Sequence, residues 1–292
     1  MALLIVVGSA AAILLSALTA LTITVRAMAA PMRGTVGEPP EGIGARSVSL
    51  TSAAGHALAG WFAPGLPCHG AVLLLHGIRA DRRMLAHRMA VLARAGIATL
   101  AIDLRAHGES GGAAVTFGHL EAHDVAGALA WLRGAAPGEK LGGLGISLGG
   151  AALLLASASV SVDAMVLESV FPDLRSAVSN RVRCVVGSAG RVVSPALLAV
   201  GEALTGARAD DLRPIEALRT YAGPVLILSG GADRHTTPEE SRAMLAAAAG
   251  PKDLWILEGA GHVDMALAAG PVYDDRMLAF FGRHLQQNTS CA

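Results

Sequence analysis

A serine flanked by glycines is the strongest chemical feature of this sequence. Residues 145–149 read Gly-Ile-Ser-Leu-Gly, the pattern G-x-S-x-G, and they lie between an apolar run and a helical pattern. On a tight strand-to-helix turn the hydroxyl of Ser147 would project above a sheet, and Gly145 and Gly149 would avoid a clash of Cβ atoms. The pattern therefore predicts Ser147 as a nucleophile, the alternative being an N-capping serine at a glycine-rich helix start.

A serine hydroxyl needs a general base, which a carboxylate holds in position. Asp233 follows a late apolar run in the stretch GGAD, and His262 follows the last such run in the stretch GAGH. Their order after Ser147 predicts Asp233 as the acid and His262 as the base. Asp264 and His235 lie nearby, and we expect them in supporting or surface positions.

Two backbone amides are candidates for stabilising an oxyanion. Leu148 begins the predicted helix after Ser147, so its N–H has no partner within that helix. Ile78 follows His76 and Gly77 at the end of an earlier apolar run, where glycine lets the backbone approach a substrate closely. We expect the His76 ring to hydrogen-bond backbone and support this loop.

The polar turn 103–110, which begins with Asp103, is expected to support the same loop. Arg79, Arg82 and Arg83 follow the loop and could meet an anionic substrate, although solvated charge is the simpler interpretation.

Composition excludes several classes of protein. The chain has 292 residues with 23 basic and 23 acidic side chains, which argues against nucleic-acid binding. With 53% hydrophobic and 16% charged residues it is not disordered. Its three cysteines form no C-x-x-C pair, so neither a disulfide scaffold nor a thiolate zinc site is expected. His119 and His123 have helical metal-ligand spacing but no third ligand, and we expect no metal and no cofactor.

Apolar runs alternate with amphipathic stretches along most of the chain. The runs predict strands at 71–76, 97–103, 141–146, 164–167, 225–229 and 253–257, and the stretches predict helices at 82–95, 119–133, 148–158, 238–249 and 273–284. Segments 46–51 and 57–63 predict an antiparallel pair at one edge. The expected fold is α/β, with a mostly parallel eight-stranded sheet covered by helices on both faces.

An interval of irregular pattern separates two of these strands. Residues 171–220 contain scattered proline and glycine with short helical pieces, and an insertion of this length in a compact domain is usually functional. We expect a helical lid there.

The first residues predict a membrane anchor. No charge occurs from Ala2 to Val25, and a helix of this length reaches about 36 Å, enough to cross a ~30 Å hydrocarbon core. A cleavable signal peptide is the alternative, although nothing basic precedes the apolar run. The expected organisation is an anchor over 1–26, a linker over 27–45, a catalytic domain over 46–287 and a tail over 288–292. Basic residues after the span and unpaired cysteines favour a cytoplasmic domain.

The motifs together resemble a known superfamily. The order HGI, DLRAHGES, GISLGG, GGADRHTTP and GAGH is similar to the α/β-hydrolases, and within them to the membrane-anchored, serine aminopeptidase-like branch, over about residues 46–287. The resemblance implies Ser147, Asp233 and His262 as the triad and the Ile78 and Leu148 amides as the oxyanion hole. Ala106 and His107 depart from this branch, which usually has glycine before the histidine.

These observations predict a serine hydrolase that cleaves an ester, thioester or amide of a small or lipophilic substrate, and the expected partner is a small-molecule or lipid-derived acyl compound. Two alternatives remain: a catalytically silent binding or scaffold protein at the membrane, and an acyltransferase. No nucleic-acid partner is expected.

Overall fold

An eight-stranded sheet forms the centre of the molecule. The computed structural model describes residues 2–287, so the predicted tail 288–292 lies outside the described residues. The strand order is β10-β9-β8-β7-β4-β5-β3-β2, with β2 and β3 antiparallel to their neighbours and the other strands parallel. The strands are β2 (Arg46–Thr51), β3 (Ala57–Ala63), β4 (Ala71–Leu75), β5 (Ala98–Ile102), β7 (Leu141–Ile146), β8 (Ala164–Glu168), β9 (Val225–Gly230) and β10 (Lys252–Leu257).

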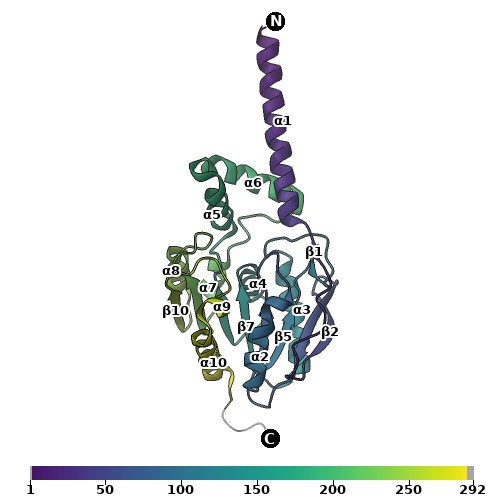
Figure 1. Ribbon diagram of the computed structural model, residues 1–292, viewed down its shortest axis with the longest axis vertical. Coiled ribbons are helices and arrows are strands. Elements are labelled where there is room, and N and C mark those ends of the chain that lie inside the picture. The colour runs from purple at the N-terminus through teal and green to yellow at the C-terminus, as the bar shows by residue number, and fades with distance from the viewer. Residues whose placement is uncertain (1, 288–292) are drawn as a thin grey trace.

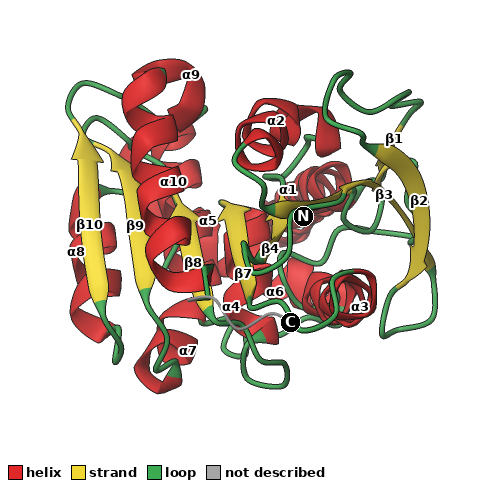
Figure 2. Ribbon diagram, turned by 90° about the horizontal axis from the view of Figure 1, so that it is seen from below, coloured by secondary structure: helices red, strands yellow, loops and turns green. Residues whose placement is uncertain are grey.

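Helices cover both faces of this sheet (Figure 2). One face carries α3 (Glu121–Ala135), α4 (Leu148–Ala156), α7 (Pro214–Thr220) and α8 (Pro238–Ala247). The other carries η1 (Arg82–Leu85), α2 (Ala86–Arg94), α9 (Met265–Ala269) and α10 (Pro271–Leu285). Strands β4, β5, β7, β8 and β9 are buried along their whole length because both faces are covered, which explains their continuous apolar runs.

The predicted α/β fold is confirmed. The antiparallel edge pair has the predicted bounds, and each predicted strand lies within one or two residues of the observed one. The predicted helix at 82–95 is a 3-10 turn, which Asp81 caps through the Arg83 amide, followed by α2.

A helical insertion connects β8 to β9. It contains α5 (Leu174–Val186), a 3-10 turn η2 (Gly187–Ala189), α6 (Gly190–Thr205) and α7. In Figure 1, α5 and α6 lie at the end of the domain from which the N-terminal helix projects. Leu174 and Leu198 pack with Leu212 in a small core of their own.

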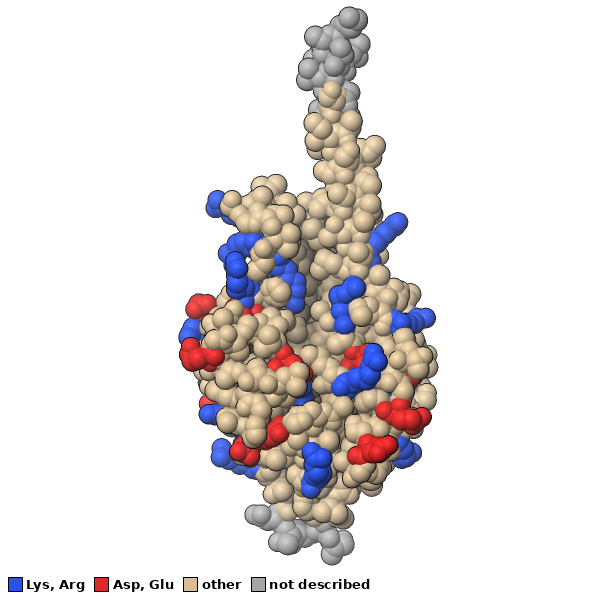
Figure 3. Space-filling model, in the orientation of Figure 1, with Lys and Arg blue, Asp and Glu red and all other residues tan. Residues whose placement is uncertain are grey.

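The N-terminal helix α1 (Ala2–Ala29) continues past the expected end of the anchor at residue 26. Val25 and Ala29 are buried, while Ile23 is exposed, and α1 contacts α6. The last turn of α1 therefore belongs to the packed domain, whereas the preceding turns project from it (Figure 1). Figure 3 shows that this projecting stem carries no charged side chain in its described part.

The segment expected as a linker is held on the domain. Strand β1 (Met32–Arg33) pairs in parallel with β6 (His107–Gly108), and Met32 donates its amide to Ala106 O at 2.7 Å. The Val36 amide bonds to the Glu109 carboxylate at 3.0 Å. Proline and glycine in this segment thus permit an extended path along the 106–109 turn and do not make a free tether.

Two helical stretches, within α1 (Ala12–Ala29) and across α5–α6 (Leu174–Thr205), are long and apolar enough to cross a membrane by length and composition. The second contains four arginines and packs against the domain through residues such as Leu197 and Leu198.

One expectation about cysteine is wrong. Cys68 is disulfide-bonded, whereas Cys184 is free and exposed. Distant cysteines can meet once the chain is folded, so their spacing did not reveal this bond. The argument from unpaired cysteines for a reducing compartment therefore fails, and the orientation of the domain stays a prediction.

Candidate active site

Ser147 occupies a sharp turn between β7 and α4. Its φ of 48° and ψ of −107° place a non-glycine residue in a strained part of backbone space. The Ser147 amide donates to Glu168 O on β8 at 2.8 Å, and its carbonyl accepts from the Ala151 amide at 3.0 Å. These bonds hold the turn above the carboxyl end of the sheet. The side chain is not an N-cap, because it accepts no bond from the first turn of α4.

The flanking glycines are required by close backbone contacts. A Cβ on Gly145 would lie 2.4 Å from the Gly150 Cα, and a Cβ on Gly149 would lie 2.6 Å from Leu75 O and 2.7 Å from His76 O. All three distances are shorter than a carbon atom tolerates, so α4 approaches the ends of β7 and β4 only because side chains are absent here.

Asp233 and His262 meet past the carboxyl ends of β9 and β10, on the edge of the sheet at which β7 ends in the Ser147 turn. His262 Nδ1 lies 2.7 Å from Asp233 Oδ2, and the Asp233 carboxylate also accepts the amides of His235 and Thr236 at 2.8 and 2.9 Å. Burial favours a higher pKa for Asp233, but the His262 contact and the two amides outweigh it and hold the pKa below its usual value. Asp233 is thus an ionised, fixed carboxylate that can orient His262.

Ser147 lies in a pocket with both candidate oxyanion donors. The pocket has a volume of about 350 Å³ counted with the space open to solvent, and its lining includes Ile78, Ser147 and Leu148. Neither the Ile78 amide nor the Leu148 amide donates to another residue in the described part of the chain. Within residues 2–287, no hydrogen bond joins Ser147 to His262. Such contacts often tighten only when substrate binds.

His76 connects the Ile78 loop to the next strand end. Its Nδ1 lies 2.7 Å from Gly77 O, and its Nε2 accepts the Leu104 amide at 3.0 Å, so the neutral ring carries its proton on Nδ1. Burial, helped by the neighbouring His107, lowers the pKa of His76 to about 3. With both nitrogens bonded to backbone, the ring is a support for the loop.

Asp103 anchors the 103–110 turn. It accepts the amides of Arg82 and Glu109 at 2.8 and 2.9 Å and pairs with the Arg82 guanidinium, which also pairs with Glu109. Solvated charge is therefore the wrong interpretation of Arg82, which is 1% exposed. In the same turn Ala106 takes the left-handed conformation (φ 60°), where the resembled branch has glycine.

Asp264 and His235 have distinct positions near the site. Asp264 caps α9 through the Ala266 amide and forms an ion pair with Arg88 at 2.8 Å. The ring of His235 lies 5.2 Å from that of His262.

The sequence reasoning missed two arginines near the site. Arg88 is fully buried, pairs with Glu168 at 2.7 Å and contacts the Tyr273 hydroxyl, so it connects α2, β8 and α10. Arg181 of α5 lines the Ser147 pocket and forms no hydrogen bond or ion pair with another described residue. The pattern of an amphipathic helix gives no signal of either role, because Glu168 and Tyr273 lie far from Arg88 along the chain, and Ser147 lies far from Arg181.

No group of three or more His, Cys, Asp or Glu side chains among residues 2–287 is arranged to hold a metal ion. His119 and His123 thus acquire no third ligand there.

Known proteins resemble this chain in sequence and in fold. A model of the alpha/beta hydrolase family matches residues 72–274, more than half of the chain. An uncharacterized protein of Mycobacterium tuberculosis is 29% identical over 239 residues, which are 80% of this chain and 78% of that protein.

Among solved structures, an esterase from Pyrococcus furiosus superposes with a TM-score of 0.74 at 21% identity, over 88% of this chain and 98% of its own. An esterase from Exiguobacterium antarcticum gives a TM-score of 0.62 at 16% identity, over 80% and 98%. At these identities the two structures show a shared fold.

Proposed function

Because the chain belongs to the alpha/beta hydrolase family, we propose that it is a serine hydrolase that cleaves carboxylic esters through an acyl-enzyme. The observation that carries this proposal is the contact of 2.7 Å between Asp233 and His262, at the same edge of the sheet as a serine on a strained glycine-flanked turn. Esterases among the structural neighbours support ester cleavage.

The proposed reaction gives each of these residues a role. His262 takes the proton of the Ser147 hydroxyl as the oxygen attacks the substrate carbonyl, and Asp233 holds the Nδ1 proton and stabilises the imidazolium. The free amides of Ile78 and Leu148 donate to the oxyanion of the tetrahedral intermediate, a contribution of about 3 kcal/mol per donor in comparable enzymes. His262 then protonates the leaving alcohol, and water releases the acyl group by the same steps in reverse.

The substrate class and the location are also proposals. The apolar residues around Ser147, such as Phe117, Phe171 and Leu174, favour a lipophilic acyl group. The helix α1 supports attachment to a membrane. Resemblance to the serine aminopeptidase-like branch makes an amide a further substrate to try, although no carboxylate lines the described pocket to bind a free amine.

An active-site probe tests the nucleophile. We expect a fluorophosphonate to label the wild-type chain and the variant Ser188→Ala, whose serine is exposed in η2, and not Ser147→Ala. Ester hydrolysis by Ser147→Ala should fall by about 10⁴-fold or more. Labelling of Ser147→Ala at the wild-type rate would refute Ser147 as the nucleophile. An unlabelled wild-type chain would refute the hydrolase proposal and favour a silent binding protein.

Product analysis distinguishes hydrolysis from acyl transfer. With water as acceptor we expect free carboxylate as the main product even when alcohols or amines are added. A dominant new ester or amide would identify an acyltransferase that uses the same triad.

A further inference from the structure

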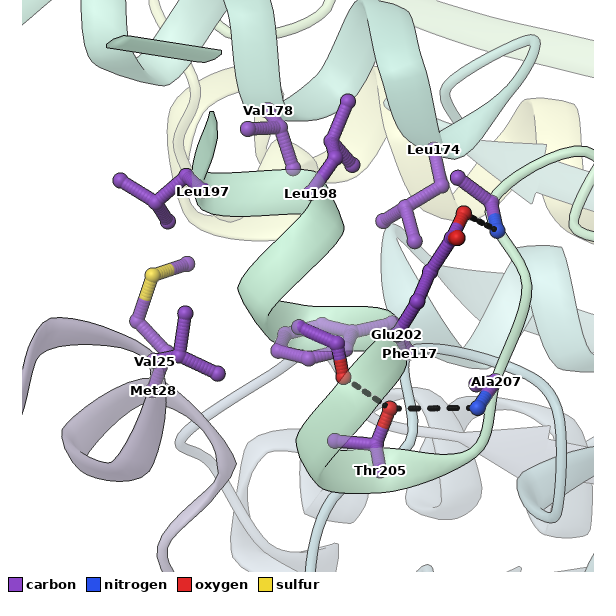
Figure 4. A pocket seen from close by; sticks show the side chains of 12 residues that line it. Val25, Met28, Phe117, Leu174, Val178, Leu197, Leu198, Glu202, Thr205 and Ala207 are labelled. Atoms are coloured by element: carbon purple, nitrogen blue, oxygen red, sulfur yellow. Dashed lines mark hydrogen bonds between the residues drawn. The ribbon is translucent and has the colours of Figure 1, made fainter. Parts of the chain in front are cut away.

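A second cavity adjoins the Ser147 pocket. It lies between the last turn of α1, the helices α5 and α6, and Phe117 (Figure 4), with a volume of about 430 Å³ counted with its open mouth. The two cavities share Met28, Phe117, Leu174 and Val178 as lining residues. A ligand bonded to Ser147 could therefore extend into the second cavity past these side chains.

The second cavity has a mainly apolar lining, because the few polar side chains in it already form hydrogen bonds with the backbone. Its polar side chains are used by the chain itself: Glu202 accepts the Ala209 amide at 2.9 Å, while Thr205 donates to Gly201 O at 2.8 Å and accepts the Ala207 amide at 3.2 Å. These bonds, dashed in Figure 4 where both partners are drawn, leave mainly methylene and methyl groups toward the space. A hydrocarbon chain fits such a surface, whereas a sugar or peptide would leave its polar groups unpaired.

Phe117 lies at the boundary between the two cavities. It adopts the left-handed conformation (φ 58°), which is strained for an aromatic residue, and Gly118 follows with a φ of 113°. Strain of this kind persists where the surroundings fix it, and it is common at ligand sites.

We infer that this second cavity binds the acyl chain of the substrate, so that the last turn of α1 is part of the substrate site as well as of the anchor. The inference rests on the proposed function, because it places the acyl carbonyl at Ser147. The place of the cavity in the molecule indicates that its occupant is an acyl chain. The cavity borders α1, the helix whose earlier turns form the apolar stem. Helix α6 forms part of the cavity wall and also carries the exposed side chains of Val192 and Leu204. An acyl chain in a bilayer would meet this end of the molecule first.

Cavity-filling variants with a matched control test the inference. A Cβ on Gly201, which lines the cavity, meets no atom within 4 Å, and the same is true of exposed Gly134 on α3. The backbone at Gly201 therefore has room for a side chain, and we expect the leucine of Gly201→Leu to occupy space in the cavity, whereas Gly134→Leu should leave the cavity unchanged. A second pair of variants lies on α1. Val25→Trp changes a buried residue that lines the cavity, and Ile23→Trp changes an exposed residue.

Hydrolysis of p-nitrophenyl acetate and laurate by the full chain in lipid nanodiscs gives the first readout. We expect Gly201→Leu and Val25→Trp to lower kcat/KM for laurate by about tenfold or more and for acetate by less than about twofold. The control variants should keep the wild-type ratio. Equal losses on both esters in a variant that keeps the wild-type melting temperature, or no loss on laurate, would overturn the inference while leaving the hydrolase proposal intact.

Crosslinking gives a second readout that needs no turnover. A palmitic acid with a terminal diazirine, photolysed with the Ser147→Ala chain in nanodiscs, should label peptides from the end of α1 and from α6, and Gly201→Leu should reduce that labelling. If the wild-type chain hydrolyses no ester but the labelling follows this pattern, the proposed function fails and the acyl site stands. Labelling confined to other peptides would overturn the site.

Discussion

At the scale of single residues, the site depends on polar groups that are fixed before substrate arrives. Asp233 is held by two amides as well as by His262, and His76 is bonded to backbone through both ring nitrogens. Preorganisation of this kind lowers the cost of stabilising the transition state, because little has to move when charge develops. It also makes stability depend on pH.

His76 predicts a loss of stability in acid. Its folded pKa of about 3 lies below the ordinary value of 6.5, so the unfolded chain takes up a proton first as the pH falls. Its contribution is complete above pH 6.5 and declines by about 1.4 kcal/mol per pH unit toward pH 3. Asp124, whose burial raises its pKa to about 7, acts in the opposite sense over part of this range.

A variant isolates the histidine contribution. The difference in unfolding free energy between the wild-type chain and His76→Gln should shrink by about 1 kcal/mol per pH unit from about pH 6 to pH 4. Denaturant titrations at several pH values measure it, with the exposed His119→Gln as control. A difference that stays constant across this range would show that His76 takes up its proton in the folded chain at an ordinary pH.

At the scale of elements, the close approach of α4 to β4 and β7 determines where Ser147 and the Leu148 amide lie. This approach depends on glycine at 145 and 149, since backbone atoms occupy the space of any side chain there. The same contacts place the Ile78 loop, at the end of β4, beside the start of α4.

Gly149→Ala tests this dependence. Its Cβ would overlap two backbone carbonyls of the β4 end, so we expect a loss of about 2 kcal/mol or more of stability and a larger loss of hydrolysis, as α4 is displaced. In Gly134→Ala the new methyl meets nothing within 4 Å, and helix propensity should stabilise that variant by about 0.5–1 kcal/mol. Thermal unfolding and ester hydrolysis of the pair supply the measurement. Equal melting temperatures would contradict the steric argument.

At the scale of the whole molecule, helix α1 has two parts. We propose that its stem is the membrane anchor, and its last turn packs on the domain. Its exposed stem and its buried last turn meet near Val25, and Ala29 O accepts the Val115 amide at 2.9 Å. Removing the stem and removing the last turn should therefore have different results.

Two truncations separate these parts. A chain that begins at residue 24 should keep its fold and its preference for laurate, because the deleted turns contact little of the domain. It should also need less detergent, because the exposed apolar stem has been removed. A chain that begins at residue 31 should expose the α6 wall, aggregate more readily and lose the preference for laurate. Light scattering and the acetate-to-laurate ratio measure the outcome. Indistinguishable truncated chains would show that the last turn of α1 contributes nothing to the domain.

Local periodicity and glycine spacing depend on neighbouring residues, so the sequence was enough to predict the α/β class, the eight strands of the main sheet and the candidates Ser147, Asp233 and His262. The partners of Arg82 and Arg88, the disulfide of Cys68 and the attachment of 30–36 to the 106–109 turn became visible in the folded chain alone. The same is true of the cavity that α1 and α6 enclose beside Ser147. These contacts join residues that are far apart along the chain. No local sequence pattern specifies which surfaces will contact each other when the helices pack on the sheet.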